Sequence, residues 1–323
     1  MNSARALRRH LHDFWILYLA PWLPSWLPWP IAYRCYRFLA RFAHVYPEPT
    51  SAAVAVAPDY LAIPDRAAFA RDVRTVWLVD AADLQLSLRH RADWLPSHVE
   101  VRGEWPQGAF VAVSFHYSTG LWVFRDLRRR GRDAVLVAAR FERDDFGPHP
   151  VRYRYGSARF AEIERLSGQP NAYRPGIRER LMGALAKGVP VVSVMDMPPR
   201  LAPRGQRPVH LLGRPACLPD GSIELAREAG VPIVPYWVEF DLARGQRTLV
   251  IGEAMSPQPA DAVLARLAGM LDGLIRSVPA AWLFWNEWPG WQRDAEGLHA
   301  AAFSNEAAEG RLSDSAPVAR NQP

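Results

Sequence analysis

Cysteine is scarce in this sequence of 323 residues, which contains only Cys35 and Cys217, far apart along the chain. Two isolated thiols provide neither a disulfide framework nor a zinc site, so a reducing compartment is expected. The sequence also lacks a phosphate-cradling glycine loop and the GxSxG motif of serine hydrolases. The acidic pair Asp144 and Asp145 has no second acidic cluster to complete a metal site. We therefore expect no metal and no bound cofactor.

Lysine is nearly absent as well, because Lys187 is the single lysine in a chain with 39 basic residues and a formal net charge of +6. Arginine forks match phosphate oxygens, so an anionic membrane, a phospholipid or a nucleic acid are candidate partners. The alternative is a GC-rich genome that encodes arginine in place of lysine. The arginines are scattered and belong to no recognised nucleic-acid-binding module, which argues against nucleic acid.

A long uncharged run is present near the N-terminus, FWILYLAPWLPSWLPWPIAY at 14–33, preceded by Arg5, Arg8 and Arg9. Its length is sufficient to span a bilayer. Its four prolines argue against one straight helix, because each removes a backbone donor and clashes with the preceding turn. Tryptophan and proline occupy the positions where a cleaved signal peptide needs small residues, so a signal peptide is not expected.

We interpret residues 1–46 as a membrane-associated hydrophobic helical hairpin. A helix over 4–20 and a second helix over 31–43 are expected, with a Trp/Pro elbow between them in the headgroup layer. The 13 tryptophans of the chain fit this interpretation, since indole rings favour membrane interfaces. A true membrane span and a helical subdomain packed on the core are the alternatives.

The rest of the sequence predicts an α/β fold, with a central, mostly parallel mixed sheet flanked by helices. A Pro/Ala-rich stretch at 47–64 is interpreted as a linker or loop. The expected domain covers 47–293, and the small polar residues of 294–323 predict a disordered tail. The predicted strands are 99–103, 109–115, 134–140, 189–195, 231–240 and 247–253, and the predicted helices are 65–95, 119–131, 156–168, 175–187, 219–230 and 259–277.

His116 follows the apolar strand AFVAVSF and precedes a predicted helix. Functional sites in open α/β sheets lie at the carboxyl ends of strands. Histidine is suited to general-base catalysis near neutral pH, although a lone histidine is more often structural than catalytic. Ser118 and Thr119, near the start of the helix, are expected to be caps.

This strand–His–helix unit resembles the opening motif of the glycerolipid and lysophospholipid acyltransferase superfamily, and most of all its branch of late lipid A acyltransferases. The related phosphatidylinositol mannoside acyltransferases are also similar. The likeness extends over roughly 4–290, and no single block decides it; the order and spacing of the blocks together carry it. The similar blocks are LPWPIAYRCYRFLARF (27–42), VAARF (137–141), RERLMGALAKGVPVVSVMDMPP (178–199), LLGRPACLPDGSIELAREAGVPIVPYWVEF (211–240) and SVPAAWLFWNEWPGW (277–291).

The resemblance implies an acyltransferase at the cytoplasmic face of the inner membrane. His116 would activate a hydroxyl or amine of a lipid acceptor for attack on an acyl thioester, carried by acyl carrier protein or coenzyme A. Arg140, which ends the second block, and Arg159 would bind an anionic part of the donor or of a lipid headgroup. The acyl chain, the carrier and the acceptor stay open.

The sequence departs from the family pattern at one position, because Leu121 stands where an acid should follow the histidine by five residues. A histidine base without an acidic partner loses control of its tautomer. Three alternatives follow: Asp196 supplies the acid from another strand end, Asp126 reaches back along the helix, or the chain is a degenerate lipid-binding member. The first predicts a His116 nitrogen within hydrogen-bond reach of Asp196, beside an apolar groove.

Overall fold

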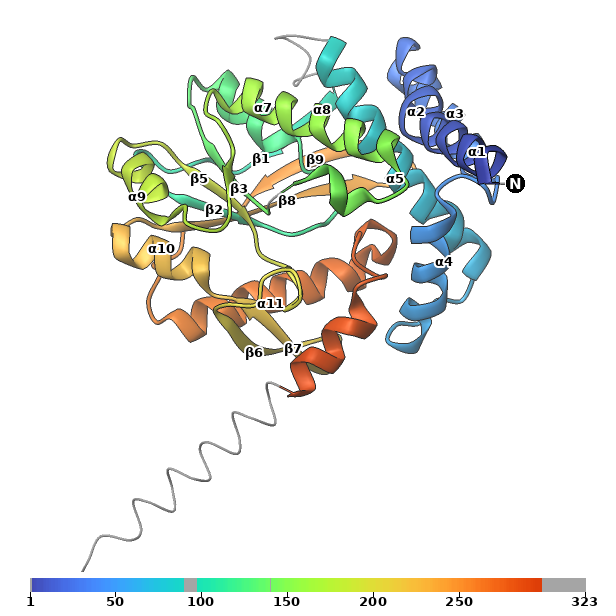
Figure 1. The fold of residues 1–323 in the computed structure, drawn as a ribbon. Helices are drawn as coiled ribbons and strands as arrows, with labels where there is room; N and C mark the ends of the chain where they lie inside the picture. The colour runs from blue at the N-terminus through green and yellow to red at the C-terminus, as the bar shows by residue number, and fades with distance from the viewer. Residues whose placement is uncertain (1, 90–97, 140, 298–323) are drawn as a thin grey trace, which may run out of the picture.

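The computed structural model describes residues 2–89, 98–139 and 141–297. Its centre is a seven-stranded sheet in the order β1 (Val99–Arg102), β9 (Gln246–Ile251), β8 (Ile233–Asp241), β2 (Val111–Ser114), β5 (Val191–Val194), β3 (Val135–Ala138) and β4 (Ala172–Tyr173) (Figure 1). The strands from β8 to β4 run parallel, β9 is antiparallel to β8, and β1 is parallel to β9. The predicted mostly parallel mixed sheet with flanking helices is confirmed.

Helices cover both faces of this sheet. On one side lie α7 (Trp122–Arg129) and α8 (Pro150–Ser167), and on the other lie α10 (Gly221–Ala229) and α11 (Ala260–Ser277), with α9 (Arg178–Ala186) near one end (Figure 1). The central strand β2 serves both layers, because Val111 and Val113 belong to one apolar cluster and Ala112 to the other. Alternation of this kind follows from the period of two in a strand.

A hairpin that the sequence did not predict consists of β6 (Gln206–Leu211) and β7 (Arg214–Pro219). Its turn residues Leu212 and Gly213 both have positive φ, 56° and 74°. Two-residue hairpin turns of this kind favour Asn-Gly or Asp-Gly, so Leu-Gly gave no signal. Burial of Leu212 in the main apolar cluster supports the unusual backbone.

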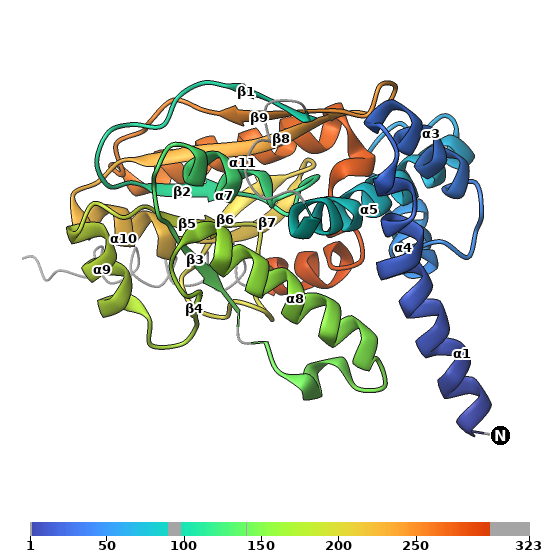
Figure 2. The same ribbon diagram turned by 90° about the horizontal axis from the view of Figure 1, so that it is seen from above.

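The N-terminal helices form a layer beside the sheet (Figure 2). Residues 2–22 are helical, as α1 (Asn2–Phe14), a π-helical segment (Trp15–Leu19) and α2 (Ala20–Trp22). The π segment ends two residues before Pro21, which lacks a backbone donor. A 3-10 turn (Pro24–Trp26) then leads to α3 (Trp29–Leu39), so two helices joined by a turn are present and the second ends four residues before the predicted bound at 43. Within the described residues, no helix combines the length and the apolar character needed to cross a membrane.

The stretch interpreted as a linker is in fact helical, so that prediction was wrong. It forms α4 (Pro47–Val56) and a 3-10 turn (Ala57–Asp59), followed by the long helix α5 (Arg66–Arg89). Proline in the first turn of a helix costs little because that N–H has no intrahelical partner. The alanines that follow are strong helix formers. Ala53 and Ala57 are buried in the main apolar cluster, so α4 belongs to the domain.

The C-terminal end of the described chain corrects one further expectation. Residues 288–297 are helical, so the predicted tail boundary at 294 falls inside a helix, while 298–323 lie outside the described residues.

The high tryptophan content of the chain reflects packing in the core as well as any contact with a membrane. Five of the tryptophans are fully buried, namely Trp122, Trp282, Trp285, Trp288 and Trp291.

Candidate active site

Two neighbouring parallel strands bring His116 and Asp196 together. The pairing of β2 with β5 sets Ser114 opposite Val194, and the Met195 N–H still donates to the Ser114 carbonyl over 2.8 Å. His116 and Asp196 each lie two residues beyond these partners, at the same height past the carboxyl edge of the sheet. The register therefore explains how residues 80 positions apart meet.

The Asp196 carboxylate orients the histidine ring. Its Oδ1 atom accepts from the backbone N–H of His116 at 2.7 Å and lies 2.8 Å from ring atom Nδ1. A carboxylate only accepts, so Nδ1 carries a proton, and in the neutral ring Nε2 holds the lone pair. The predicted contact between His116 and Asp196 is confirmed. The carboxylate is fully buried, whereas 30% of the histidine side chain is exposed.

A third side chain, Trp282, completes the cluster, and sequence reasoning gave it no role. Its indole Nε1–H donates to the second carboxylate oxygen, Oδ2, at 3.0 Å. The only hint in the sequence was the spacing of three that repeats through Trp282, Trp285, Trp288 and Trp291, whose rings contact one another mostly edge to face. Contacts with these buried rings fix the position of the Trp282 indole.

The segment that carries Trp282 runs beside the histidine. Leu283 N–H donates to the His116 carbonyl at 2.9 Å, and Ser118 N–H donates to the Ala281 carbonyl at 2.7 Å. The Phe284 ring stacks on the imidazole, with ring centroids 3.9 Å apart and an interplanar angle of 16°. Backbone bonds and ring stacking with the 281–284 segment thus fix the position of His116.

The residues just after the histidine are not helix caps, so that prediction was wrong. Helix α7 begins at Trp122, and its N-cap residue Leu121 makes no side-chain capping bond. Ser118 has a φ of 57°, a left-handed conformation that non-glycine residues rarely adopt. The hydroxyls of Ser118 and Thr119 are buried and have no partner among the described residues. Strain and unpaired polar groups of this kind gather at functional sites.

The position of the missing acid is part of the core. Leu121 is 2% exposed and belongs to an apolar cluster with residues of α7 and β2. The alternative partner Asp126 is also ruled out, because its oxygens accept from Trp105 Nε1 at 2.9 Å, Arg129 at 3.0 Å and Arg130 at 2.9 Å. Of the two candidate carboxylates, only Asp196 meets the histidine.

The two arginines proposed as substrate ligands have different outcomes. Arg140 lies outside the described residues. Both terminal nitrogens of Arg159 donate to Asp80, at 2.7 and 2.8 Å, which ties α8 to α5. Burial opposes the charge of Arg159, but the Asp80 carboxylate and the Tyr155 hydroxyl outweigh it, and the pKa of the guanidinium is raised. The fork expected to hold a substrate phosphate is therefore filled from within the protein.

Other features bound what the site can do. No cluster of three metal-ligating side chains occurs in the part of the chain that the structure describes. The arginine-lined groove and the apolar groove of the N-terminal layer are lined by residues between 15 and 74, so the apolar groove predicted beside His116 has no counterpart in them. What the site offers is a partly exposed imidazole with an oriented lone pair, backed by a buried carboxylate.

Comparisons with known proteins add no identification. No protein-family model matches the chain, and no curated protein matches it either.

Proposed function

We propose that the protein is an acyltransferase that moves a fatty acyl group from an acyl thioester to a hydroxyl or amine of a lipid acceptor. The single observation that carries the proposal is the His116–Asp196 pair, with its carboxylate held by Trp282. The histidine is exposed enough to meet a substrate, and its partner is not. This is the arrangement of an oriented general base.

The proposed reaction needs no covalent enzyme intermediate. His116 Nε2 takes the proton of the acceptor O–H or N–H while the acceptor atom attacks the thioester carbonyl carbon. The tetrahedral intermediate collapses as the carbon–sulfur bond breaks, and the leaving thiolate takes the proton back from the imidazolium. Asp196 stabilises the imidazolium and keeps Nδ1–H in place throughout.

The resemblance to the lysophospholipid acyltransferase superfamily supports this proposal, and Asp196 offers an answer to the departure at Leu121. A carboxylate from the neighbouring strand would take the role that the family gives to an acid within the motif. Acyl carrier protein or coenzyme A would carry the acyl group, and the acceptor would lie in the inner membrane.

A membrane location is supported by where apolar side chains are exposed. Of 13 large hydrophobic side chains exposed on the described surface, ten lie between Leu7 and Phe42. Exposed apolar patches of this density are typical of membrane or protein interaction sites. The N-terminal helices would thus lie in the membrane surface as a hydrophobic hairpin, with the enzyme domain on its cytoplasmic side.

The test compares lipids from a deletion strain that carries the wild type, His116→Ala or a control variant, His149→Ala. Mass spectrometry should find an acylated lipid that is lost with His116→Ala and kept with His149→Ala. Purified protein should release thiol from an acyl thioester only when the corresponding acceptor is added. If the deletion strain has unchanged lipids and the purified protein releases no thiol, the acyltransferase proposal is wrong. The non-catalytic lipid-binding alternative would then be favoured.

A further inference from the structure

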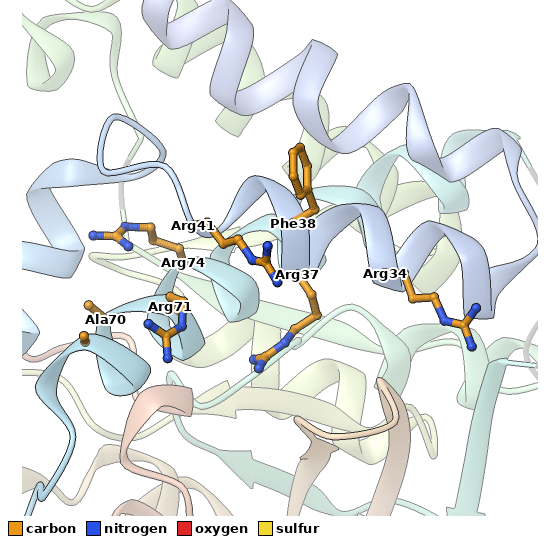
Figure 3. Close-up of a pocket in the computed structure, with 8 residues that line it drawn as sticks. Arg34, Arg37, Phe38, Arg41, Ala70, Arg71 and Arg74 are labelled. Atoms are coloured by element: carbon orange, nitrogen blue, oxygen red, sulfur yellow. The ribbon is translucent and has the colours of Figure 1, made fainter.

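A groove lined by arginine lies between α3 and α5, away from the histidine. Its volume is about 930 Å³, and its lining residues are Arg34, Arg37, Phe38, Arg41, Ala67, Ala70, Arg71 and Arg74 (Figure 3). On each helix the lining positions follow spacings of three and four, which is one helix face. Ala67 and Ala70 on the α5 side have small side chains and take up little of the groove.

The positive charge in this groove is largely uncompensated. Among the described residues, only Arg37 of the five has a carboxylate partner, Asp72. Arg74 donates from one terminal nitrogen to the Ala40 carbonyl at 3.1 Å, but its Nε–H is buried and has no partner in the described part of the chain. Burial and the neighbouring charge of Arg71 both lower the pKa of Arg74. A groove lined by several arginines with few carboxylate partners favours a bound anion.

A second, apolar groove of about 440 Å³ adjoins the first, and the two share Arg34 and Phe38. It lies between α3 and the helical segment 15–24, and its other lining residues are Trp15, Leu19, Ala20, Leu23, Pro24, Ile31, Cys35 and Leu39. Several of these side chains belong to the exposed apolar surface, with Leu23 52% and Ile31 48% exposed. A ligand that crosses Arg34 would therefore pass from guanidinium groups to hydrocarbon.

We propose that the two grooves together bind one anionic phospholipid of the membrane. Its phosphate would lie among the guanidinium groups of the arginine groove, and an acyl chain would lie in the apolar groove. Arginine provides the planar donor pairs that phosphate oxygens accept. The joined apolar groove and the exposed side chains around it favour a membrane lipid over a soluble phosphate or an acidic protein, because neither of those would cover them.

This proposal goes beyond acyl transfer and does not depend on it. The lipid bound here would orient the N-terminal layer on the membrane, and its grooves include neither His116 nor Asp196. Vesicle binding is therefore measured in wild-type protein and in His116→Ala, which should bind equally. If His116→Ala loses acyl transfer but binds vesicles as the wild type does, the lipid site is supported. If the wild-type protein transfers acyl groups but does not bind vesicles, the lipid site is wrong and the catalytic proposal is unaffected.

The decisive variant is the double change Arg34→Gln and Arg71→Gln. Neither side chain has an ion-pair partner among the described residues, so folding should be preserved, and a thermal melt checks this. The matched control is Arg204→Gln with Arg214→Gln, which removes the same charge from exposed positions in and beside the β6–β7 hairpin. Flotation uses phosphatidylcholine vesicles with and without phosphatidylglycerol.

Each arginine near an anionic membrane surface strengthens binding to it. Removing two arginines should therefore lower the affinity for the vesicles by roughly 30-fold. The groove variant should lose about this much binding to vesicles that contain phosphatidylglycerol, and the control variant less than about threefold. Equal losses in both double variants would overturn the proposal, since they would reflect net charge alone. It would also be overturned if the groove variant kept vesicle binding but lost binding to acyl carrier protein.

A native thiol reports on the apolar half of the site. Cys35 lines the apolar groove, whereas burial raises the pKa of Cys217 to about 11 and keeps that thiol unreactive. Maleimide should therefore label Cys35 first, and vesicles with phosphatidylglycerol should slow the labelling. Glycerol 3-phosphate should not slow it. Protection by glycerol 3-phosphate as strong as that by vesicles would indicate a soluble phosphate site and overturn the lipid assignment.

Discussion

Among the described residues, two histidine–aspartate pairs have nearly the same geometry in different surroundings. His116 Nδ1 lies 2.8 Å from Asp196, and His149 Nδ1 lies 2.7 Å from Asp13. Both carboxylates are fully buried, and both imidazoles are partly exposed, 30% for His116 and 23% for His149. Distance and burial alone therefore do not distinguish a catalytic pair from a structural one.

The difference lies in what else holds each carboxylate. Asp196 accepts from a backbone N–H and from the Trp282 indole, both neutral donors, so its charge stays available to the imidazolium. Asp13 also binds the Arg152 guanidinium at 2.9 Å, which already neutralises it.

The two pairs also differ in their place in the fold. The first lies past the carboxyl ends of two central strands, where sites of α/β sheets lie. The second joins the end of α1 to the residue that precedes α8. Through the bond from Arg152 to Glu48, α4 is linked as well. We interpret the second pair as a clasp between the N-terminal layer and the domain.

The largest expected contrast is in acyl transfer by the two alanine variants. His116→Ala removes the general base and should lower the rate by roughly 10²–10⁴-fold. His149→Ala should leave the rate within about threefold, because the Asp13 carboxylate that His149 contacts is still paired with Arg152. Thiol release from the acyl thioester, measured with the acceptor identified by mass spectrometry, decides between them. Equal losses in both variants would mean that the first pair has no special role.

The second contrast concerns the carboxylate. In Asp196→Asn one amide end must face the His116 donors and the other the Trp282 N–H, so one donor always meets an NH₂ group. The ring loses its fixed tautomer, and we expect a rate loss of roughly 10²-fold or more, up to the 10⁴-fold typical of such a change. Circular dichroism should show a folded protein. A variant with the wild-type rate would contradict the orienting role.

Much of the first pair could be predicted from the sequence, and almost none of the second. The apolar runs AFVAVSF and VPVVSVM are followed directly by His116 and Asp196. The carboxyl ends of parallel strands in one sheet lie at the same edge. His149 and Asp13 are 136 residues apart, and neither ends a strand. No periodic pattern connects a helix end to a loop residue, so only tertiary packing brings them together.

The fold shows the same division between local and non-local information. The α/β alternation and the end of the strand at His116 are local patterns, and they were predicted correctly. Helix α4 was missed because prolines were interpreted as loop markers, although they occupy a first turn where proline is tolerated. The indole donor of Trp282 was not predicted because Trp282 follows no predicted strand, so no local pattern places its ring beside Asp196, 86 residues away.

The third contrast is smaller and concerns stability: a change at Asp13 should lower the free energy of unfolding and have little effect on acyl transfer. Asp13→Asn keeps the shape but removes the charge shared by His149 and Arg152, and we expect about 1–3 kcal/mol loss in the free energy of unfolding. Because the affected bonds hold α1 against α8, the rate of acyl transfer by the folded protein should change little. Urea unfolding measures the first quantity and kcat the second. A large fall in kcat without loss of stability would argue against the clasp.

The smallest expected effect isolates the neutral donor that distinguishes Asp196 from Asp13. Trp282→Phe leaves Asp196 Oδ2 without its 3.0 Å donor and keeps most of the buried ring volume. An unpaired buried acceptor costs about 1–3 kcal/mol in stability. Because His116 still donates twice to Oδ1, the rate should fall by only about tenfold or less. Trp285→Phe is the matched control, since its indole donates to the Pro279 carbonyl and not to Asp196. If the two variants lose rate equally, the contribution of Trp282 is packing, and the indole bond to the carboxylate has no separate part in holding the base.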